Sequence, residues 1–293
     1  MTLVNSHTVP TQALHGGPVR DAILDALGKR LEAAGRPVVN LATVLVGDDA
    51  PSQKYVASKH RTATSIGIGS VRVELPASVS QATLESEVAR LVADSSVHGI
   101  LVQMPLPGHL DAERVLALIP AEKDVDGLTE ASLGRLVRGV PGHVGCTPLG
   151  VMRILSHHGI ATAGARAVVV GRSTLVGLPL SILLGLKGND ATVTLAHSRT
   201  NDLAEVCRQA DILVSATGVA RSIGADHVKP GATVIDVGIS RTESGIVGDV
   251  DWDAVQGIAG AVTPMPGGTG LLTVACLMEN TVAAAVMQGV RIP

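Results

Sequence analysis

The chain has 293 residues, of which 46% are hydrophobic and 17% are charged, and its formal net charge is −3. This length suits two modest domains, and the composition is that of a soluble globular protein. The weak negative charge and the scarcity of aromatic side chains exclude a surface built for nucleic-acid backbones or stacked bases.

The first half of the sequence alternates predicted helices and strands. Helices are expected over 18–34, 51–66 and 80–93, and strands over 39–46, 71–75 and 99–103. This alternation predicts a parallel α/β sheet, in which ligands gather at the carboxyl ends of the strands. Gln103 lies at such an end, where a polar side chain is as often structural as functional.

The helix over 51–66 carries the only tyrosine of the chain, Tyr55, four residues before Lys59. This spacing places both side chains on one helical face. Taken alone, the spacing favours a core tyrosine and a solvated lysine over a shared site. Asp126, within the charged run 123–127, is in the same way compatible with an ordinary turn.

The second half of the sequence predicts a doubly wound nucleotide-binding fold. An apolar helix over 151–158 leads into it, and an amphipathic helix from 273 to about 288 ends the chain. Strands bounded by small residues are expected at 165–170, 191–196, 211–215, 233–237 and 260–263. Small residues at strand ends let a flat ligand approach the backbone closely.

A glycine-bracketed turn at 171–177 joins the first of these strands to a helix. Such a turn presents backbone N–H groups to a phosphate, although the spacing is not GxGxxG. The next strand ends in His197-Ser198-Arg199-Thr200, where NAD-binding folds usually carry an acid for the ribose hydroxyl. Because that acid is absent, and Arg172 stands nearby in the turn, the sequence predicts NADP rather than NAD.

Three cysteines, Cys146, Cys207 and Cys276, show neither disulfide nor zinc-ligand spacing. The N-terminal residues lack the basic and then apolar pattern of a signal peptide. The charge-free stretch 254–278 contains glycines and prolines, which suits a buried strand and loop better than a membrane span. We therefore expect no metal site, no membrane partner and a cytoplasmic location.

Several motifs occur in a fixed order along the chain. They are VGDDAPSQKYVASK (46–59), GILVQMPLP (99–107), KDVDG (123–127), CTPLG (146–150), GRSTLVGLP (171–179), VIDVGI (234–239) and TPMPGGTG (263–270). On these motifs the chain resembles the bifunctional methylenetetrahydrofolate dehydrogenase/cyclohydrolase (FolD) family over essentially its whole length. The resemblance reverses the default interpretations of Tyr55, Lys59, Gln103 and Asp126.

The resemblance implies an enzyme of folate one-carbon metabolism. 5,10-Methylenetetrahydrofolate would be oxidised with NADP+ to 5,10-methenyltetrahydrofolate, which is then hydrolysed to 10-formyltetrahydrofolate. The implied catalytic residues are Lys59, Tyr55, Gln103 and Asp126. The implied cofactor contacts are Gly171, Arg172, Ser173, Ser198, Thr217, Gly218 and Ile239. Reduced folate would contact Tyr55, Gln103 and Asp126, together with Pro266, Gly267, Gly270 and Leu271.

The expected organisation is two α/β domains with the cleft between them. A folate-binding catalytic domain is expected over 1–148, completed by the C-terminal helix 273–293, and an NADP-binding Rossmann-like domain over 149–272. A homodimer is implied by the resemblance. Two alternatives stay open: a monofunctional methylenetetrahydrofolate dehydrogenase, and a non-catalytic NADP-binding protein on the same fold.

The chain departs from the family at one loop. After the Pro-Gly-Gly segment the family usually reads Gly-Pro-Met-Thr, whereas this sequence has Gly270-Leu271-Leu272-Thr273. A proline at 271 would fix the backbone at the helix entry. Leucine there is therefore expected to leave a loop that becomes ordered when folate binds, or to mark a shifted substrate preference.

Overall fold

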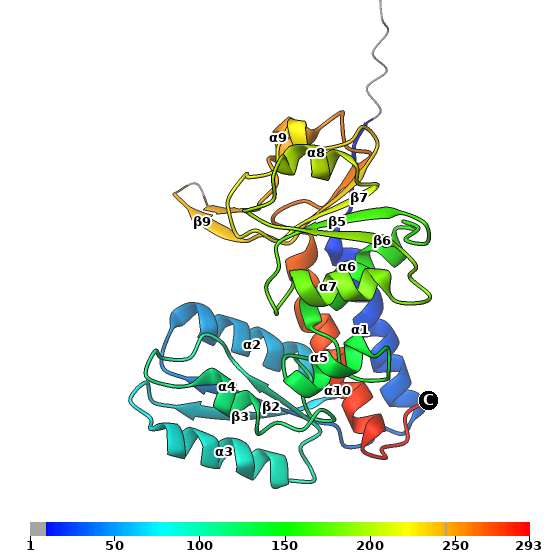
Figure 1. Cartoon of the computed structure of the whole chain (residues 1–293). Helices are drawn as coiled ribbons and strands as arrows, with labels where there is room; N and C mark the ends of the chain where they lie inside the picture. Colours follow the sequence, from blue (N-terminus) through cyan, green and yellow to red (C-terminus); the bar gives the residue numbers. More distant parts are fainter. Residues whose placement is uncertain (1–9, 244) are drawn as a thin grey trace, which may run out of the picture. The chain divides into compact units, whose positions relative to one another are not determined.

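The computed structural model describes residues 10–243 and 245–293 (Figure 1). The chain divides into two compact units. The three-stranded unit comprises Arg20–Cys146 and Thr273–Pro293. The six-stranded unit comprises the residues up to Val19 and Thr147–Leu272.

The three-stranded unit is built on a parallel sheet with the strand order β3-β2-β4. Its strands are β2 (Asn40–Val46), β3 (Gly69–Leu75) and β4 (Gly99–Val102). The helices α2 (Ala50–Ser65) and α3 (Gln81–Ala93) cover opposite faces of this sheet (Figure 1). Most of α1 (Gly16–Ala33), the short α4 (Ala112–Leu116) and α5 (Glu130–Val137), and nearly all of α10 (Leu272–Met287) complete the unit.

Local signals in the sequence explain where these helices begin. The Asp49 carboxylate accepts the Ser52 backbone N–H at 2.9 Å, and Pro51 lies in the first turn of α2. The Ser80 hydroxyl caps α3 in the same way. Side-chain caps satisfy N–H groups that have no partner within the helix. Apolar residues at every second position of β2 then join the apolar face of α3 in one core.

The six-stranded unit contains a parallel sheet with the order β1-β11-β8-β7-β5-β6. Its strands are β1 (Gln12–Ala13), β5 (Arg166–Val170), β6 (Thr192–Ala196), β7 (Ile212–Ser215), β8 (Thr233–Asp236) and β11 (Ala261–Val262). Its helices are α6 (Cys146–His157, nearly all in this unit), α7 (Gly177–Gly185), α8 (Leu203–Arg208), α9 (Trp252–Val255), and the short 3-10 turns η1 (Ala225–His227) and η2 (Thr269–Leu271). A separate hairpin is formed by β9 (Ser240–Thr242) and β10 (Gly245–Val247).

Four differences from the sequence-based expectations are the clearest. Residues 12–13 pair with β11 in the six-stranded sheet, although the sequence assigned them to the first domain. The helix expected over 151–158 begins earlier, at Cys146. The short helices α4 and α5 were not predicted, because five and eight residues are too few for a clear periodic pattern.

The fourth difference concerns α10, which was expected to be amphipathic. Most of its side chains are buried, with Ala283, Val286 and Met287 among the exposed ones. The stretch Thr269–Met287 is long and apolar enough to cross a membrane, and 56% of it is buried inside the structure. A helix that is apolar on nearly all sides is typical of a protein core.

Candidate functional site

Lys59 lies on the buried face of α2. The buried residues of this helix are Ser52, Val56, Lys59 and Ala63, a spacing that defines one helical face. Lys59 is 9% exposed, whereas Tyr55, one turn earlier, is 50% exposed. The simple expectation of a core tyrosine and a solvated lysine is therefore reversed, and a buried lysine requires a partner.

Gln103 supplies that partner. It follows β4 directly, and its backbone N–H donates to the Val44 carbonyl oxygen at 2.8 Å, which fixes the residue at the carboxyl end of the sheet. The Lys59 Nζ donates to the Gln103 Oε1 at 2.9 Å. The Gln103 Nε2 in turn donates to the Met104 carbonyl oxygen at 2.7 Å. The amide can therefore present only its oxygen to Lys59, and it orients the amine without adding charge.

Asp126 reaches the same edge of the sheet through a tightly held loop. A parallel bridge between Ile100 and Asp124 aligns the loop with β4. The Asp124 carboxylate, 1% exposed, accepts backbone N–H groups from Gly127, Leu128 and Thr129. Asp124 therefore shapes the turn, which leaves the partly exposed Asp126 free of that task.

The pKa values of Lys59 and Asp126 are both shifted from their ordinary values. Burial lowers the pKa of Lys59, and the negative charge of Asp126 partly opposes this effect. Burial raises the pKa of Asp126, against the opposing influence of the Lys59 charge. Both groups are thus shifted toward their neutral forms, which suits side chains that exchange protons.

Cys146 is a member of this group that the sequence analysis did not identify. Its side chain is buried, its Sγ lies 3.5 Å from the Val125 carbonyl oxygen, and burial raises its thiol pKa well above the ordinary value. The thiol is therefore protonated at neutral pH and donates a hydrogen bond. Its place in the CTPLG motif was the available signal, but the cysteines had been considered only as disulfide or zinc ligands.

The residues expected to bind the cofactor lie at one edge of the six-stranded sheet. Since all its strands are parallel, their carboxyl ends share that edge. The expected residues follow four strand ends in turn: Gly171, Arg172 and Ser173 after β5, Ser198 after β6, Thr217 and Gly218 after β7, and Ile239 after β8. Pro266 and Gly267, which are expected to contact folate, follow β11. The side chains of Arg172, Ser173, Ser198 and Ile239 are exposed.

The turn after β5 fits a phosphate group. Gly171 has φ +122°, a backbone conformation that favours glycine, and a Cβ on it would overlap the Ala216 carbonyl oxygen. A Cβ on Gly177 would overlap the Gly171 carbonyl oxygen. No side-chain cap closes the N-terminus of α7, but the Leu178 N–H donates to the Ser173 carbonyl oxygen and Pro179 has no N–H. The fit to a phosphate therefore rests on the glycine-bracketed turn itself.

The loop after β11 contains the remaining residues expected to contact folate. Gly270 and Leu271 lie in η2, and the Leu271 backbone N–H donates to the Gly268 carbonyl oxygen at 3.3 Å. That leucine leaves a loop which becomes ordered when folate binds stays a prediction. The N–H that a proline would remove is already satisfied within the turn.

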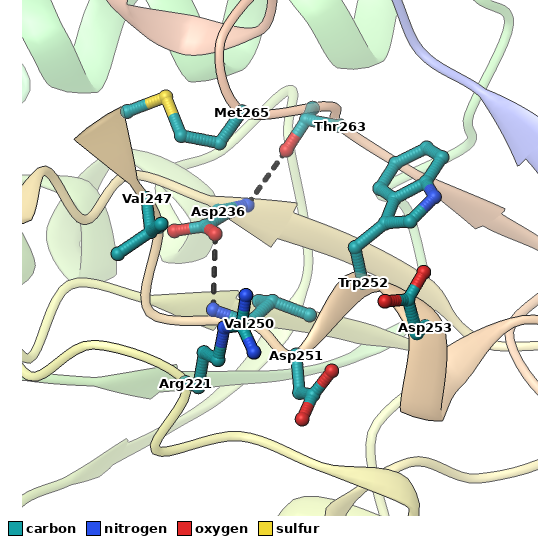
Figure 2. Close-up of a pocket in the computed structure, with 10 residues that line it drawn as sticks. Arg221, Asp236, Val247, Val250, Asp251, Trp252, Asp253, Thr263 and Met265 are labelled. Atoms are coloured by element: carbon teal, nitrogen blue, oxygen red, sulfur yellow. Dashed lines mark hydrogen bonds between the residues drawn. The ribbon is translucent and has the colours of Figure 1, made fainter. Parts of the chain in front are cut away.

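A second buried charged cluster, also missed from sequence, lies behind these loops. Asp236 is 3% exposed, and its carboxylate accepts the backbone N–H groups of Gly238, Asp249 and Val250. Its own N–H donates to the Thr263 hydroxyl at 2.7 Å (Figure 2). Burial raises the pKa of Asp236 to about 6.

Asp249 is the other acid of this cluster and is fully buried. Its Oδ2 accepts the Ser215 hydroxyl at 3.1 Å and the backbone N–H groups of Thr217 and Gly218 at 2.6 and 3.2 Å. A Cβ on Gly238 would overlap the Asp249 carboxylate. Asp249 thus fixes the loop after β7 and contacts the segment after β8.

A small pocket of about 80 Å³ lies beside this acid cluster (Figure 2). Asp236 lines it together with Arg221, Trp252 and Met265. Asp236 is the last residue of β8 and Thr263 follows β11, so the pocket lies at the carboxyl ends of these two strands.

Among residues 10–243 and 245–293, no group of three or more His, Cys, Asp or Glu side chains is arranged to hold a metal ion.

These features define a class: an α/β protein with a buried lysine–glutamine–aspartate group in one unit and a nucleotide-type parallel sheet in the other. Two family models match the sequence. The catalytic domain of tetrahydrofolate dehydrogenase/cyclohydrolase matches residues 14–126, and the NAD(P)-binding domain of the same family matches residues 145–289. The chain belongs to the tetrahydrofolate dehydrogenase/cyclohydrolase family.

Curated relatives match nearly the whole chain. "Bifunctional protein FolD" of Methanoculleus marisnigri is 51% identical over 93% of this chain and 95% of the relative. "Bifunctional protein FolD 2" of Frankia alni is 53% identical over 84% of each chain.

Solved structures share the fold. The bifunctional FolD enzyme of Campylobacter jejuni has a TM-score of 0.91 and 40% identity, with 94% of this chain and 99% of that chain covered. The FolD enzyme of Trypanosoma brucei, complexed with NADP cofactor and inhibitor, has a TM-score of 0.88 and 37% identity, with 95% of this chain and 98% of that chain covered.

Proposed function

We propose that this chain is a bifunctional enzyme that oxidises 5,10-methylenetetrahydrofolate with NADP+ and then hydrolyses the product to 10-formyltetrahydrofolate. The observation that carries the proposal is the Lys59–Gln103 hydrogen bond of 2.9 Å beside Asp126, in a chain of this family. A buried amine held by a neutral amide, with a carboxyl group nearby, is a proton-transfer site.

Each side chain has a distinct task in the hydrolytic step. Lys59, in its neutral form, accepts a proton from water as a C–O bond forms at the methenyl carbon. One C–N bond of the methenyl bridge then breaks, and the nitrogen released takes a proton, so that the reaction consumes one water and releases one proton. Gln103 keeps the Lys59 amine oriented, and Asp126 accepts hydrogen bonds from the pterin amino group and ring N–H.

The exposed ring of Tyr55 provides a surface for the pterin at the rim of the same helix. The cofactor, when bound, supplies the acceptor for the hydride that leaves the methylene carbon. The turn 171–177 would hold its phosphates, and the loops after β7 and β8 would hold its other end.

The preference for NADP rests on Arg172, Ser173 and Ser198. All three are exposed and follow neighbouring strands, and no acid occupies the position that binds a ribose hydroxyl. Arg172→Ala should weaken NADP binding by about tenfold or more and leave NAD binding nearly unchanged, because a charged hydrogen bond is lost only from the 2′-phosphate. Lys187→Ala, an exposed cation of the same unit, is the matched control. Equal weakening of both cofactors would make Arg172 structural and overturn the NADP assignment.

A homodimer and a cytoplasmic location belong to the same proposal. They follow from the resemblance to the family and from the soluble composition of the chain. Light scattering on the purified chain tests the dimer, and cell fractionation tests the location.

The alternatives are a dehydrogenase without hydrolase activity and a non-catalytic NADP-binding protein. An absorbance assay with 5,10-methylenetetrahydrofolate and NADP+ separates them, because NADPH and methenyl-folate absorb at different wavelengths. A bifunctional enzyme forms NADPH and also accelerates the decay of added methenyl-folate. A dehydrogenase alone forms NADPH and methenyl-folate in equal amounts, and a sensor forms neither.

A further inference from the structure

The last helix, α10, carries one buried amide that reaches the candidate catalytic group. Asn280 is 6% exposed on a helix whose buried residues are mostly apolar, among them Leu277 and Met278. A buried amide in such surroundings costs free energy unless its hydrogen bonds are made. The partners of Asn280 therefore indicate what the side chain contributes.

Both N–H groups of the Asn280 amide are used. The Nδ2 donates to the Val125 carbonyl oxygen at 2.8 Å and to the Val144 carbonyl oxygen at 2.9 Å. Val125 immediately precedes Asp126, and Val144 lies two residues before Cys146. A single amide thus joins the two segments that carry Asp126 and Cys146.

The two segments meet where the amide bridges them. Gly127 has φ +66°, and a Cβ there would lie 2.5 Å from the backbone N of Gly145. The Cys146 thiol also donates to the Val125 carbonyl oxygen, and the Asn280 Nδ2 lies 3.8 Å from its sulfur. The Cys146 thiol and the Asn280 amide therefore both connect the two segments through the Val125 carbonyl oxygen.

Asn280 is not needed to form the turn itself. The Asp124 carboxylate already accepts three backbone N–H groups within the loop. Asn280 instead fixes the position of the turn that carries Asp126 relative to the segment 144–146. This distinction separates the placement of Asp126 from the folding of its loop.

We propose that Asn280 is a positioning residue that sets the location of Asp126 relative to Lys59 and Cys146, and thereby the affinity for reduced folate. The inference rests on the proposed function, since it deepens the role of the same site. Asn280 itself contacts only carbonyl oxygens and a thiol, so it acts through Asp126.

The test compares two amides of the C-terminal segment. Gln288, the residue after α10, donates to the His98 and Glu122 carbonyl oxygens at 2.7 and 3.2 Å, at positions that precede the Asp124 bridge. Asn280→Leu and Gln288→Leu therefore each remove an amide that ties the C-terminal segment to the sheet and its loop. Only the first removes a contact next to Asp126.

We expect Asn280→Leu to raise the KM for methylenetetrahydrofolate and the Kd for tetrahydrofolate, measured by titration calorimetry, by about 5–20-fold. The Kd for NADP should stay within about twofold of the wild-type value. Gln288→Leu should lower the melting temperature without moving either constant. Asn280→Asp, which turns a double donor into an acceptor facing two carbonyls, should exceed the leucine effect.

The inference is overturned if a folded Asn280→Leu variant keeps the wild-type folate constants, or if the folate and NADP constants rise together. Should the leucine variant not fold, Asn280→Ser leaves space for a bridging water, and a selective rise in the folate constants supports the role equally. Failure of the proposed function is a different result, because the wild-type chain itself would then neither turn over nor bind reduced folate.

Discussion

The two units of this chain each bury charged side chains, but they satisfy them in different ways. In the three-stranded unit, Lys59 and Asp126 are both shifted toward neutrality by burial, and each offsets the shift of the other. In the six-stranded unit, the carboxylates of Asp236 and Asp249 accept several backbone N–H groups at the ends of two strands.

This difference distinguishes side chains that can exchange protons from side chains that hold the backbone in place. In the part of the chain that the structure describes, the hydrogen-bond partner of Lys59 is the neutral Gln103 side chain, so Lys59 can change its protonation state without breaking a backbone contact. Asp249 holds the Thr217–Gly218 loop, so a change in its charge would release the loop. The first cluster is therefore suited to proton transfer, and the second to holding the loops expected to bind the cofactor.

The largest expected effect comes from Lys59→Met. Loss of a positioned general base should reduce the cyclohydrolase rate by about 10²–10⁴-fold. Lys54→Met, an exposed lysine on the same helix, is the matched control and should keep the wild-type rate. Hydrolysis of methenyl-folate followed by absorbance provides the measurement, and a normal rate in a folded Lys59→Met variant would remove Lys59 from the mechanism.

The thermal stability of Lys59→Met provides a second test of the role of Lys59. Because burial lowers the pKa of Lys59 below that of the unfolded chain, the charged form costs the folded state free energy at neutral pH, and stability rises as pH increases through the folded-state pKa toward 10.5. Lys59→Met removes this cost, so its melting temperature at pH 7 should equal or exceed that of the wild type. A clear drop in a thermal melt would show that the lysine stabilises the fold.

Asp249→Asn should affect the other unit. The amide cannot accept all the bonds that the Asp249 Oδ2 accepts, so the loop after β7 loosens, and NADP should bind about 5–20-fold more weakly. The cyclohydrolase rate with methenyl-folate should not change. Calorimetric titration with NADP provides the measurement, and Asp253→Asn, an exposed acid of the same unit, serves as the control. Unchanged NADP affinity would show that Asp249 does not shape a cofactor site.

The interaction between the Asp126 and Lys59 charges gives a smaller effect, on the pH dependence of cyclohydrolysis. The Asp126 charge raises the pKa of Lys59 against the dominant effect of burial, so Asp126→Asn should lower that pKa further. The rising limb of the pH profile of kcat for cyclohydrolysis should then move to lower pH. A limb that stays in place, with folate at saturation, would show that Lys59 is not the group that titrates.

The smallest expected effect is that of Leu271→Pro. The Leu271 N–H bonds to the Gly268 carbonyl oxygen within η2, so proline removes one exposed hydrogen bond while it restricts the unfolded chain. These effects oppose each other, and the folate KM should stay within about threefold of the wild-type value. A collapse of turnover in steady-state kinetics would show that leucine is required and would favour a different folate substrate.

The sequence predicted the strand-to-helix order from its hydrophobic pattern. It implied the Lys59, Gln103 and Asp126 group only through the resemblance of its motifs to the family, because the spacing of these residues alone favours ordinary structural roles. It could not predict Asn280, whose partners Val125 and Val144 are backbone carbonyls more than 130 residues away. Asp249 was missed for the same reason, since any residue type can offer the N–H groups that it accepts. The pairing of residues 12–13 with β11 was missed because two residues carry no periodic pattern.

The division of labour between the two clusters is tested most directly by measuring cyclohydrolase rate and NADP affinity on Lys59→Met and Asp249→Asn side by side. The account predicts that Lys59→Met loses hydrolysis and keeps NADP binding, while Asp249→Asn keeps hydrolysis and loses NADP affinity. If either folded variant lost both properties together, the clusters would not have separate tasks, and the account would be contradicted.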